Sequence, residues 1–334
     1  MNMLIILLLL FIQVESKAPY ELSFTKSIYN TIHVNTYVGS HLQNLDLSVT
    51  FCETFIGLNS RSKYETYKSS AHHLLYATSN GITFTDLVQF SNNNNKSFSE
   101  IPMILFNKNK DGRIGYIGLA PRKGSVNETL LGHIFSQIPN SKKIMYIDYK
   151  SSKIGFGDYP TNKNNLRNYK YCNLLSKVND NSIDSTGFYC HLDMIYYKFD
   201  NKYVYYHFKT PIKFCVEANA IYCPREYIDF LADTYFKDAI SKKQCIVVHN
   251  EEGYTYINCN NNYNYKSLPN WTIVFDNFSF KLTPEDLFTT VEGELFFLIC
   301  NSPNRNVWFF GYPVLKKFVT VFDLEKMQLQ FIPQ

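Results

Sequence analysis

The feature that most limits the fold is a succession of short stretches of alternating polarity, which begins at Ile28. Clusters of Asn, Gly and Ser separate these stretches, as expected for strands joined by turns. The chain holds 26 Tyr and 27 Phe against 14 Gly, and aromatic side chains pack well on the pleated surface of a strand. The sequence therefore predicts a mostly β protein with a few short helices.

Two hairpins and one helix are the clearest local elements. Thr31 to Val38 and Leu45 to Phe51 flank a Gly-Ser turn, and Leu74 to Tyr76 and Ile82 to Phe90 flank a second turn that contains Asn-Gly. Glu226 to Ser241 follows a proline and carries apolar residues at helical spacing, which predicts a helix.

The N-terminal segment indicates export. Its apolar run, Leu4 to Ile12, is too short to span a bilayer, and small residues follow at Val14 and Ser16. We interpret residues 1–16 as a secretory signal peptide, with a buried N-terminal strand as the alternative. No later segment is long enough for a transmembrane helix. We therefore expect a secreted protein, or one in the lumen of the secretory or endolysosomal pathway.

A polar, Asn-rich stretch near the middle, Thr161 to Tyr169, indicates a boundary between two lobes, 17–165 and 166–334. The formal net charge of +4 comes from scattered basic residues, which argues against a nucleic-acid partner. None of the eight cysteines forms a CxxC pair, so neither a metal site nor a cofactor is predicted. Four sequons are candidate glycosylation sites, and they begin at Asn95, Asn127, Asn270 and Asn277.

The C-terminal block carries the strongest resemblance to a known family. Phe309 to Asp323 reads F-F-G-Y-P-V-L-K-K-F-V-T-V-F-D. It resembles the pepsin-family signature of the type I-L-G-D-x-F-L-R-x-Y-Y-T-V-F-D. Further blocks that resemble this family occur upstream in the family's order: Gly39 to Gln43, Tyr76 to Gly81, Gly115 to Ala120, Ile154 to Asp158, and Leu282 to Asp286. The resemblance implies a bilobal pepsin-like acid-protease fold, with Tyr76 at the family's flap tyrosine.

The same resemblance places the two catalytic motifs. Counting forward from Gln43 puts Thr50 at the first aspartate position and Cys52 at its glycine position. Counting back from Pro224 puts Cys215 at the second aspartate position and Glu217 at its glycine position. Both catalytic aspartates of the family are therefore expected to be missing.

The expected consequence is a loss of catalysis. Aspartic protease chemistry needs two carboxyl groups about 3 Å apart that share a proton, one to activate water and the other to polarise the scissile carbonyl. Glu53 and Glu217 are the neighbouring carboxylates that could replace the pair, provided both loops changed shape. Asp46 lies four residues before Thr50, roughly 13 Å away along a strand. We expect no rescue.

The cysteines allow several pairings. The resemblance implies a disulfide between Cys259 and Cys300, and Cys172 and Cys190 lie on neighbouring predicted strands and could pair. Our specific hypothesis is that Cys52 and Cys215 form a disulfide that joins the inactive centre. The alternatives are that Cys215 pairs with Cys223 or Cys245, or that Cys52 is a buried free thiol.

The sequence thus predicts a secreted pseudoprotease that binds a peptide or protein in a cleft between its lobes, with Tyr76, Glu53 and Glu217 as cleft residues. The alternative is a divergent endopeptidase that uses Glu53 and Glu217 as its carboxylate pair. A third interpretation is a structural or surface protein with no preserved cleft.

Overall fold

The structure is a computed structural model. It describes residues 19–27, 31–59, 64–65, 69–78, 81–90, 96–106, 115–121, 126–160, 169–175, 186–199, 201–275, 278–301 and 308–334. The proposed signal peptide, residues 1–16, and nearly all of the predicted lobe boundary lie outside these ranges, as do Asn95, Asn277 and the side chain of Tyr76. Within the described ranges no helix is long and apolar enough to cross a membrane.

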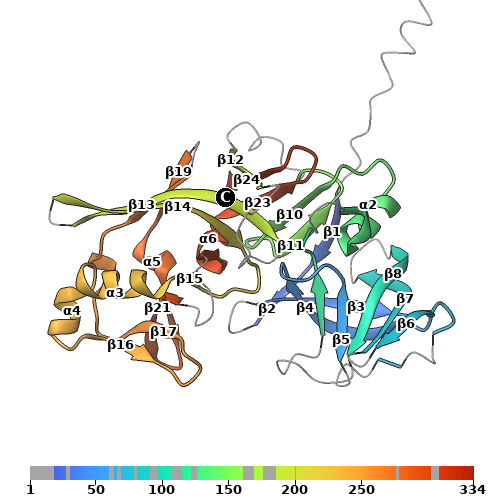
Figure 1. Cartoon of the computed structure of the whole chain (residues 1–334), viewed down its shortest axis with the longest axis horizontal. Helices are drawn as coiled ribbons and strands as arrows, with labels where there is room; N and C mark the ends of the chain where they lie inside the picture. The colour runs from blue at the N-terminus through green and yellow to red at the C-terminus, as the bar shows by residue number, and fades with distance from the viewer. Residues whose placement is uncertain are drawn as a thin grey trace, which may run out of the picture.

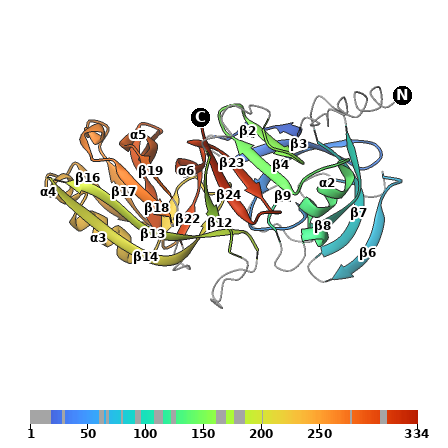
Figure 2. The ribbon, with the colours of Figure 1, turned by 90° about the horizontal axis from the view of Figure 1, so that it is seen from above.

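Strands dominate the described part of the chain, and they form three sheets. One sheet belongs to each half of the sequence, and a third, six-stranded sheet takes strands from both halves (Figures 1 and 2). The predicted mostly β architecture of two lobes is therefore confirmed.

The sheet of the first half has the strand order β2-β3-β4-β9-β5-β8-β7-β6. Its strands are β2 (Thr25–Lys26), β3 (Ile32–Val38), β4 (Gln43–Thr50), β5 (Ile56–Asn59), β6 (His73–Thr78), β7 (Gly81–Phe90), β8 (Ser97–Phe106) and β9 (Gly115–Gly118). Both predicted hairpins are present, because β3 pairs antiparallel with β4 and β6 pairs antiparallel with β7.

The ten-stranded sheet belongs to the second half and has the order β16-β17-β21-β15-β22-β14-β13-β18-β19, with β20 paired to β21. Its strands are β13 (Phe188–Phe199), β14 (Lys202–Phe214), β15 (Ile221–Cys223), β16 (Cys245–His249), β17 (Thr255–Cys259), β18 (Trp271–Phe275), β19 (Phe278–Leu282), β20 (Phe288–Val291), β21 (Glu294–Asn301) and β22 (Trp308–Phe310).

The shared sheet joins the lobes and has the order β1-β11-β10-β23-β24-β12. Its strands are β1 (Tyr20–Ser23), β10 (Ile144–Asp148), β11 (Lys153–Phe156), β12 (Lys170–Asn173), β23 (Phe318–Asp323) and β24 (Gln328–Pro333). The junction is the antiparallel pairing of β10 with β23, in which Met145 lies opposite Phe322. Figure 2 shows β23 and β24, in red, between the two lobes.

The helices are short and lie outside the sheets. They are η2 (Val126–Glu128), α2 (Leu130–Gln137), α3 (Arg225–Asp233), α4 (Lys237–Ser241), η4 (Tyr265–Ser267), α5 (Pro284–Leu287) and α6 (Tyr312–Leu315). The single helix predicted from Glu226 to Ser241 is in fact α3 and α4. The break between them buries Tyr235 and Phe236, whose rings pack edge-on against Trp271 and Phe297 respectively.

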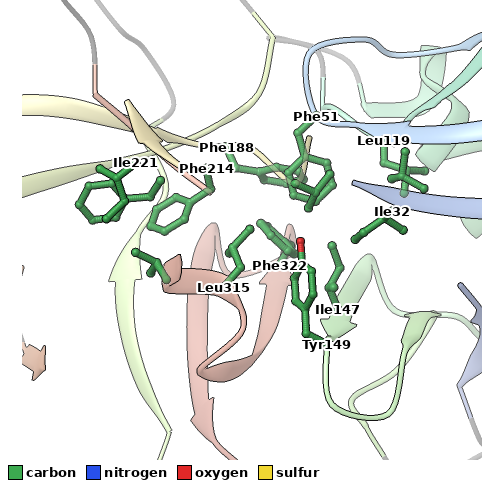
Figure 3. Packing of buried hydrophobic residues seen from close by; sticks show 14 of the residues in the cluster. Ile32, Phe51, Leu119, Ile147, Tyr149, Phe188, Phe214, Ile221, Leu315 and Phe322 are labelled. Carbon is green, nitrogen blue, oxygen red and sulfur yellow. The ribbon is translucent and has the colours of Figure 1, made fainter. Parts of the chain in front are cut away.

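A continuous hydrophobic core runs from one lobe into the other. At the junction the rings of Phe51, Phe188 and Phe322 contact one another, with centroids 4.2–5.0 Å apart. Figure 3 shows these rings between side chains of the first lobe, such as Leu119, and side chains of the second lobe, such as Leu315. Phe51 directly follows Thr50, so this aromatic contact fixes the position of the candidate site.

Candidate functional site

Thr50 and Cys215 occupy corresponding places in two repeated strand arrangements. In the first lobe β4 runs parallel to β9, and β5 runs antiparallel to β9. In the second lobe β14 runs parallel to β22, and β15 runs antiparallel to β22. Thr50 ends β4 opposite Gly118, and Cys215 follows the end of β14 next to Gly311.

Gly118 and Gly311 lie against the loops that follow Thr50 and Cys215, with no room for a side chain at either glycine. A Cβ atom on Gly118 would lie 2.6 Å from the carbonyl oxygen of Glu53, and a Cβ atom on Gly311 would lie 2.1 Å from that of Ala218. Glu53 and Ala218 each lie three residues after the corresponding strand-end residue. The backbone of the two lobes thus repeats at the centre, while the side chains differ.

Glu217 extends from the second lobe to the first. One carboxylate oxygen accepts a hydrogen bond of 2.7 Å from the Thr50 hydroxyl, and the other accepts one of 3.0 Å from the Phe51 backbone N–H. The Thr50 hydroxyl itself accepts a hydrogen bond from the backbone N–H of Cys52. Thr50 is buried and Glu217 is half-buried. These charge-assisted bonds hold the carboxylate in a fixed orientation at the lobe junction.

Cys52 makes the reciprocal contact, from the first lobe to the second. Its thiol lies beside that of Cys215, and one ligand atom from each of Cys52, Cys215 and Glu217 lies within 4.8 Å of the other two. Burial raises the pKa of the Cys215 thiol well above its ordinary value, and the hydrogen bond with Cys52 and the charge of Glu217 raise it further. The raised pKa favours the protonated form of the Cys215 thiol.

The hypothesis of a disulfide between Cys52 and Cys215 is wrong in this structure, which leaves both as free thiols. The structure does bring the two sulfur atoms together, as that hypothesis required. The alternatives that paired Cys215 with Cys223 or Cys245 are also wrong, because Cys223 is free and Cys245 pairs elsewhere. Cys52 is half-buried.

The other two acidic residues near Thr50 do not join this cluster. Among the described residues, the group of ligand atoms comprises Cys52, Cys215 and Glu217, and Glu53 is not a member. Glu53 instead uses its backbone carbonyl to accept a hydrogen bond from Ala120. Asp46 is exposed and lies 3.4 Å from His33.

Two residues that the sequence analysis did not select lie near the centre. Lys213 on β14 is buried, its ammonium lies 5.6 Å from the Tyr189 ring centroid, and its charge lowers the pKa of Cys215. Its position in an apolar strand, between Ile212 and Phe214, was the signal that could have identified it. Tyr149 is buried, and its hydroxyl has no hydrogen-bond partner among the described residues.

The pKa of the Tyr149 hydroxyl responds to the charge of Glu217, one member of the cluster. Burial raises the pKa of its hydroxyl, and the charge of Glu217 raises it further. Its ring packs edge-on against that of Tyr312, with centroids 5.4 Å apart. In Figure 3 the hydroxyl points towards the aromatic contact at Phe322. No local sequence pattern marks Tyr149, because it lies in a turn and reaches the centre only through the tertiary fold.

The remaining predicted residues have mixed outcomes. Tyr76 lies on β6, but its side chain is outside the described part of the structure, so its role as a cleft residue stays a prediction. Asn127 and Asn270 are exposed, as a glycosylation site requires. Apart from these predicted residues, Tyr222 packs against the small cluster of Cys215, Ala218 and Phe309, and Cys52 packs against the same cluster.

One of the two predicted disulfides outside the centre is confirmed and the other is wrong. Cys172 pairs with Cys190. Cys259 pairs with Cys245 and not with Cys300. The reason is strand register: Cys245 and Cys259 lie opposite each other on β16 and β17, with Cα atoms 4.0 Å apart, whereas Cys300 on β21 lies opposite Tyr256.

The comparisons with known proteins agree with this geometry. A family model described as eukaryotic aspartyl protease matches residues 170–334. The crystal structure of the aspartic proteinase from Irpex lacteus is similar, with a TM-score of 0.71 and 14% sequence identity. That match covers 95% of this chain and 98% of the Irpex chain. No curated protein sequence matches the chain.

Proposed function

Because residues 170–334 belong to the eukaryotic aspartyl protease family and nearly the whole chain has the fold of an aspartic proteinase, we propose that this protein is a secreted, catalytically inactive pepsin-like homologue. We propose further that it binds a peptide or protein through the cleft between its lobes. The cysteine content and the two disulfides support export, since disulfides persist in oxidising compartments.

The observation that carries the proposal is the chemistry of the two strand ends. Thr50 and Cys215 occupy corresponding positions there, and neither side chain is a carboxylic acid. A threonine hydroxyl cannot act as a general base near neutral or acid pH, and the pKa of the Cys215 thiol is raised, which keeps it from being a thiolate nucleophile. The pair of carboxyl groups that shares a proton in aspartic proteases has no counterpart at these positions.

The contacts of Glu217 argue against the alternative of a rearranged carboxylate pair. Both of its oxygens accept hydrogen bonds, one from the Thr50 hydroxyl and one from the Phe51 backbone N–H, so both oxygens already contact the first lobe. Glu53 does not belong to the cluster that contains Glu217. A protease of this type needs a second carboxyl group that shares a proton with the first, whereas the groups that cluster with Glu217 are the thiols of Cys52 and Cys215.

A binding role is supported by the exposed apolar side chains of β6, the strand that carries the predicted cleft residue Tyr76. This strand is at the edge of its sheet, and the exposed fractions of Leu74 and Leu75 are 61% and 54%. The pairing of β6 with β7 is irregular between Leu74 and Tyr76, which lets two consecutive leucines face solvent. An exposed edge strand with apolar side chains can add a peptide as a further strand.

The first test is cleavage of a broad fluorogenic peptide library by the purified protein from about pH 2 to pH 8, with and without pepstatin. We expect turnover no higher than that of the Glu53→Gln, Glu217→Gln double variant prepared in parallel. Turnover that the double variant abolishes would overturn the proposal of inactivity and would identify the two glutamates as a replacement pair.

The second test measures binding to a surface-displayed library of random peptides. We expect enrichment of peptides that the Leu74→Ser, Leu75→Ser variant binds at least tenfold more weakly. The matched control is Ile246→Ser, which removes an apolar side chain that is 56% exposed on β16 of the other lobe and leaves affinity unchanged. Equal loss in both variants, or no enrichment, would contradict binding at β6.

A further inference from the structure

We propose that Cys52, Cys215 and Glu217 form a zinc-binding site that joins the two lobes where the family places its aspartates. The inference concerns metal binding and does not rest on the proposed peptide-binding function. Its three ligands come from two distant parts of the sequence: Cys52 from the first lobe, and Cys215 and Glu217, two residues apart, from the second. A search for CxxC pairs cannot detect ligands that only the tertiary fold brings together, and for that reason the sequence predicted no metal site.

The types of ligand atom select the metal. Two thiolates and a carboxylate match the donors that Zn²⁺ accepts, whereas Mg²⁺ and Ca²⁺ prefer sites made only of oxygen atoms. With these three ligands Zn²⁺ keeps a fourth coordination position for a water molecule or a ligand oxygen.

The spacing of the ligand atoms fits one ion. Zn–S bonds of about 2.3 Å in a tetrahedral site place two sulfur atoms roughly 3.8 Å apart. The two sulfurs and the carboxylate oxygen already lie within 4.8 Å of one another, so small side-chain rotations can bring them onto one ion. The partial exposure of Cys52 and Glu217 gives the ion a route from solvent.

The groups around the ligands support the site. Thr50 and the Phe51 N–H hold the Glu217 carboxylate, as outer hydrogen bonds hold the ligands of known metal sites. Two thiolates and one carboxylate carry three negative charges, one more than Zn²⁺ neutralises. The buried ammonium group of Lys213 is positive and favours the thiolate form of Cys215.

The experiment is a Co²⁺ titration of the reduced, metal-free protein followed by competition with Zn²⁺. We expect one Co²⁺ per chain, thiolate-to-cobalt charge-transfer absorption, displacement by Zn²⁺, and a higher melting temperature in Zn²⁺. Cys52→Ser, Cys215→Ser and Glu217→Gln should each weaken binding more than tenfold. Cys223→Ser and Cys300→Ser are matched controls, because they remove the other two free thiols and should leave the titration unchanged.

A measurement on the unmodified chain avoids variants that fail to fold. Bound Zn²⁺ should slow alkylation of Cys52 at least tenfold, as quantified by peptide mass spectrometry. Binding that persists in Cys52→Ser, or that is lost in Cys223→Ser, would overturn the proposal. So would a disulfide between Cys52 and Cys215 in protein purified without reductant, because a disulfide leaves no thiolate for the metal.

Discussion

At the scale of single residues, the centre is defined by two side chains that each cross from one lobe to the other. Glu217 contacts Thr50, and Cys52 contacts Cys215. The resemblance to the pepsin-like family places these four residues at its aspartate and glycine positions. Glycine has no side chain, so only a substitution there permits such crossing contacts. We therefore expect the proposed loss of catalytic groups to be linked to the gain of inter-lobe contacts.

The crossing contact of Glu217 should be measurable as stability. We expect Glu217→Gln to lower the free energy of unfolding by about 1.5–3 kcal/mol, because hydrogen bonds to a charged carboxylate contribute about that much. Denaturant unfolding at neutral pH measures the change. The control is Glu252→Gln, which neutralises an exposed turn residue and should change stability by no more than about 0.5 kcal/mol. Equal stability of the two variants would show that the contact with Thr50 is absent in solution.

At the scale of elements, Asp286 connects two short helices beside the centre. It closes the capping box of α5 with Thr283 and forms an ion pair with Lys317, which follows α6. Helix α6 begins directly after Gly311, and two residues after its end the chain enters β23, the strand that joins the lobes. Burial alone would raise the pKa of Asp286, but the hydrogen bonds from Lys317 and Thr283 outweigh it, and the pKa is lowered.

The lowered pKa predicts a specific pH dependence. The pKa of the Asp286 carboxyl is lower in the folded protein than its ordinary value of 3.8. Its contribution to stability is therefore complete above pH 3.8, and it is lost as the pH falls through the lower pKa of the folded state. We expect Asp286→Asn to cost about 1.5–3 kcal/mol at pH 7 and progressively less below pH 4, approaching the wild type in strong acid. Urea unfolding across this range measures the difference.

The control for this prediction is Asp229→Asn, which removes an exposed partner of Arg225. That substitution should leave the dependence on pH unchanged. A constant gap between wild type and Asp286→Asn from neutral to strongly acid pH would contradict the lowered pKa.

The disulfides give a second prediction at this scale. Mass mapping of peptides under non-reducing conditions should detect Cys172 linked to Cys190 and Cys245 linked to Cys259. The Cys245→Ser, Cys259→Ser variant should be less stable by about 2–5 kcal/mol, and Cys300→Ser should retain both links. A peptide that links Cys259 to Cys300 would instead support the pairing implied by the family resemblance and would mean that β16, β17 and β21 differ in register.

At the scale of the whole molecule, the two lobes share one sheet and one continuous core. The ring of Phe51 comes from the first lobe, and it contacts Phe188 and Phe322 of the second-lobe sequence. Met145 and Phe322 lie opposite each other in the β10–β23 pairing. Such an interface favours unfolding of both lobes in one cooperative step.

Truncation of this aromatic contact should destabilise both lobes together. Phe51 is fully buried, and Phe51→Ala should lower the free energy of unfolding by about 3–5 kcal/mol. Tyrosine fluorescence and circular dichroism should still report a single transition. The control Leu74→Ala removes an exposed side chain and should have little effect. Two separate transitions in the wild-type protein would contradict a shared core.

The sequence by itself determined the fold class and both N-terminal hairpins, and it indicated that Cys172 and Cys190 could pair. Alternating polarity, turn residues and family-like blocks are local signals, and local backbone preferences decide strands and turns. Only the tertiary structure decided that Cys245 pairs with Cys259, that Glu217 reaches Thr50, and that Lys213 is buried. Those contacts depend on register between strands and on closure of the two lobes. A one-residue change of register moves every side chain to the other face, and no local pattern encodes which distant residues then meet.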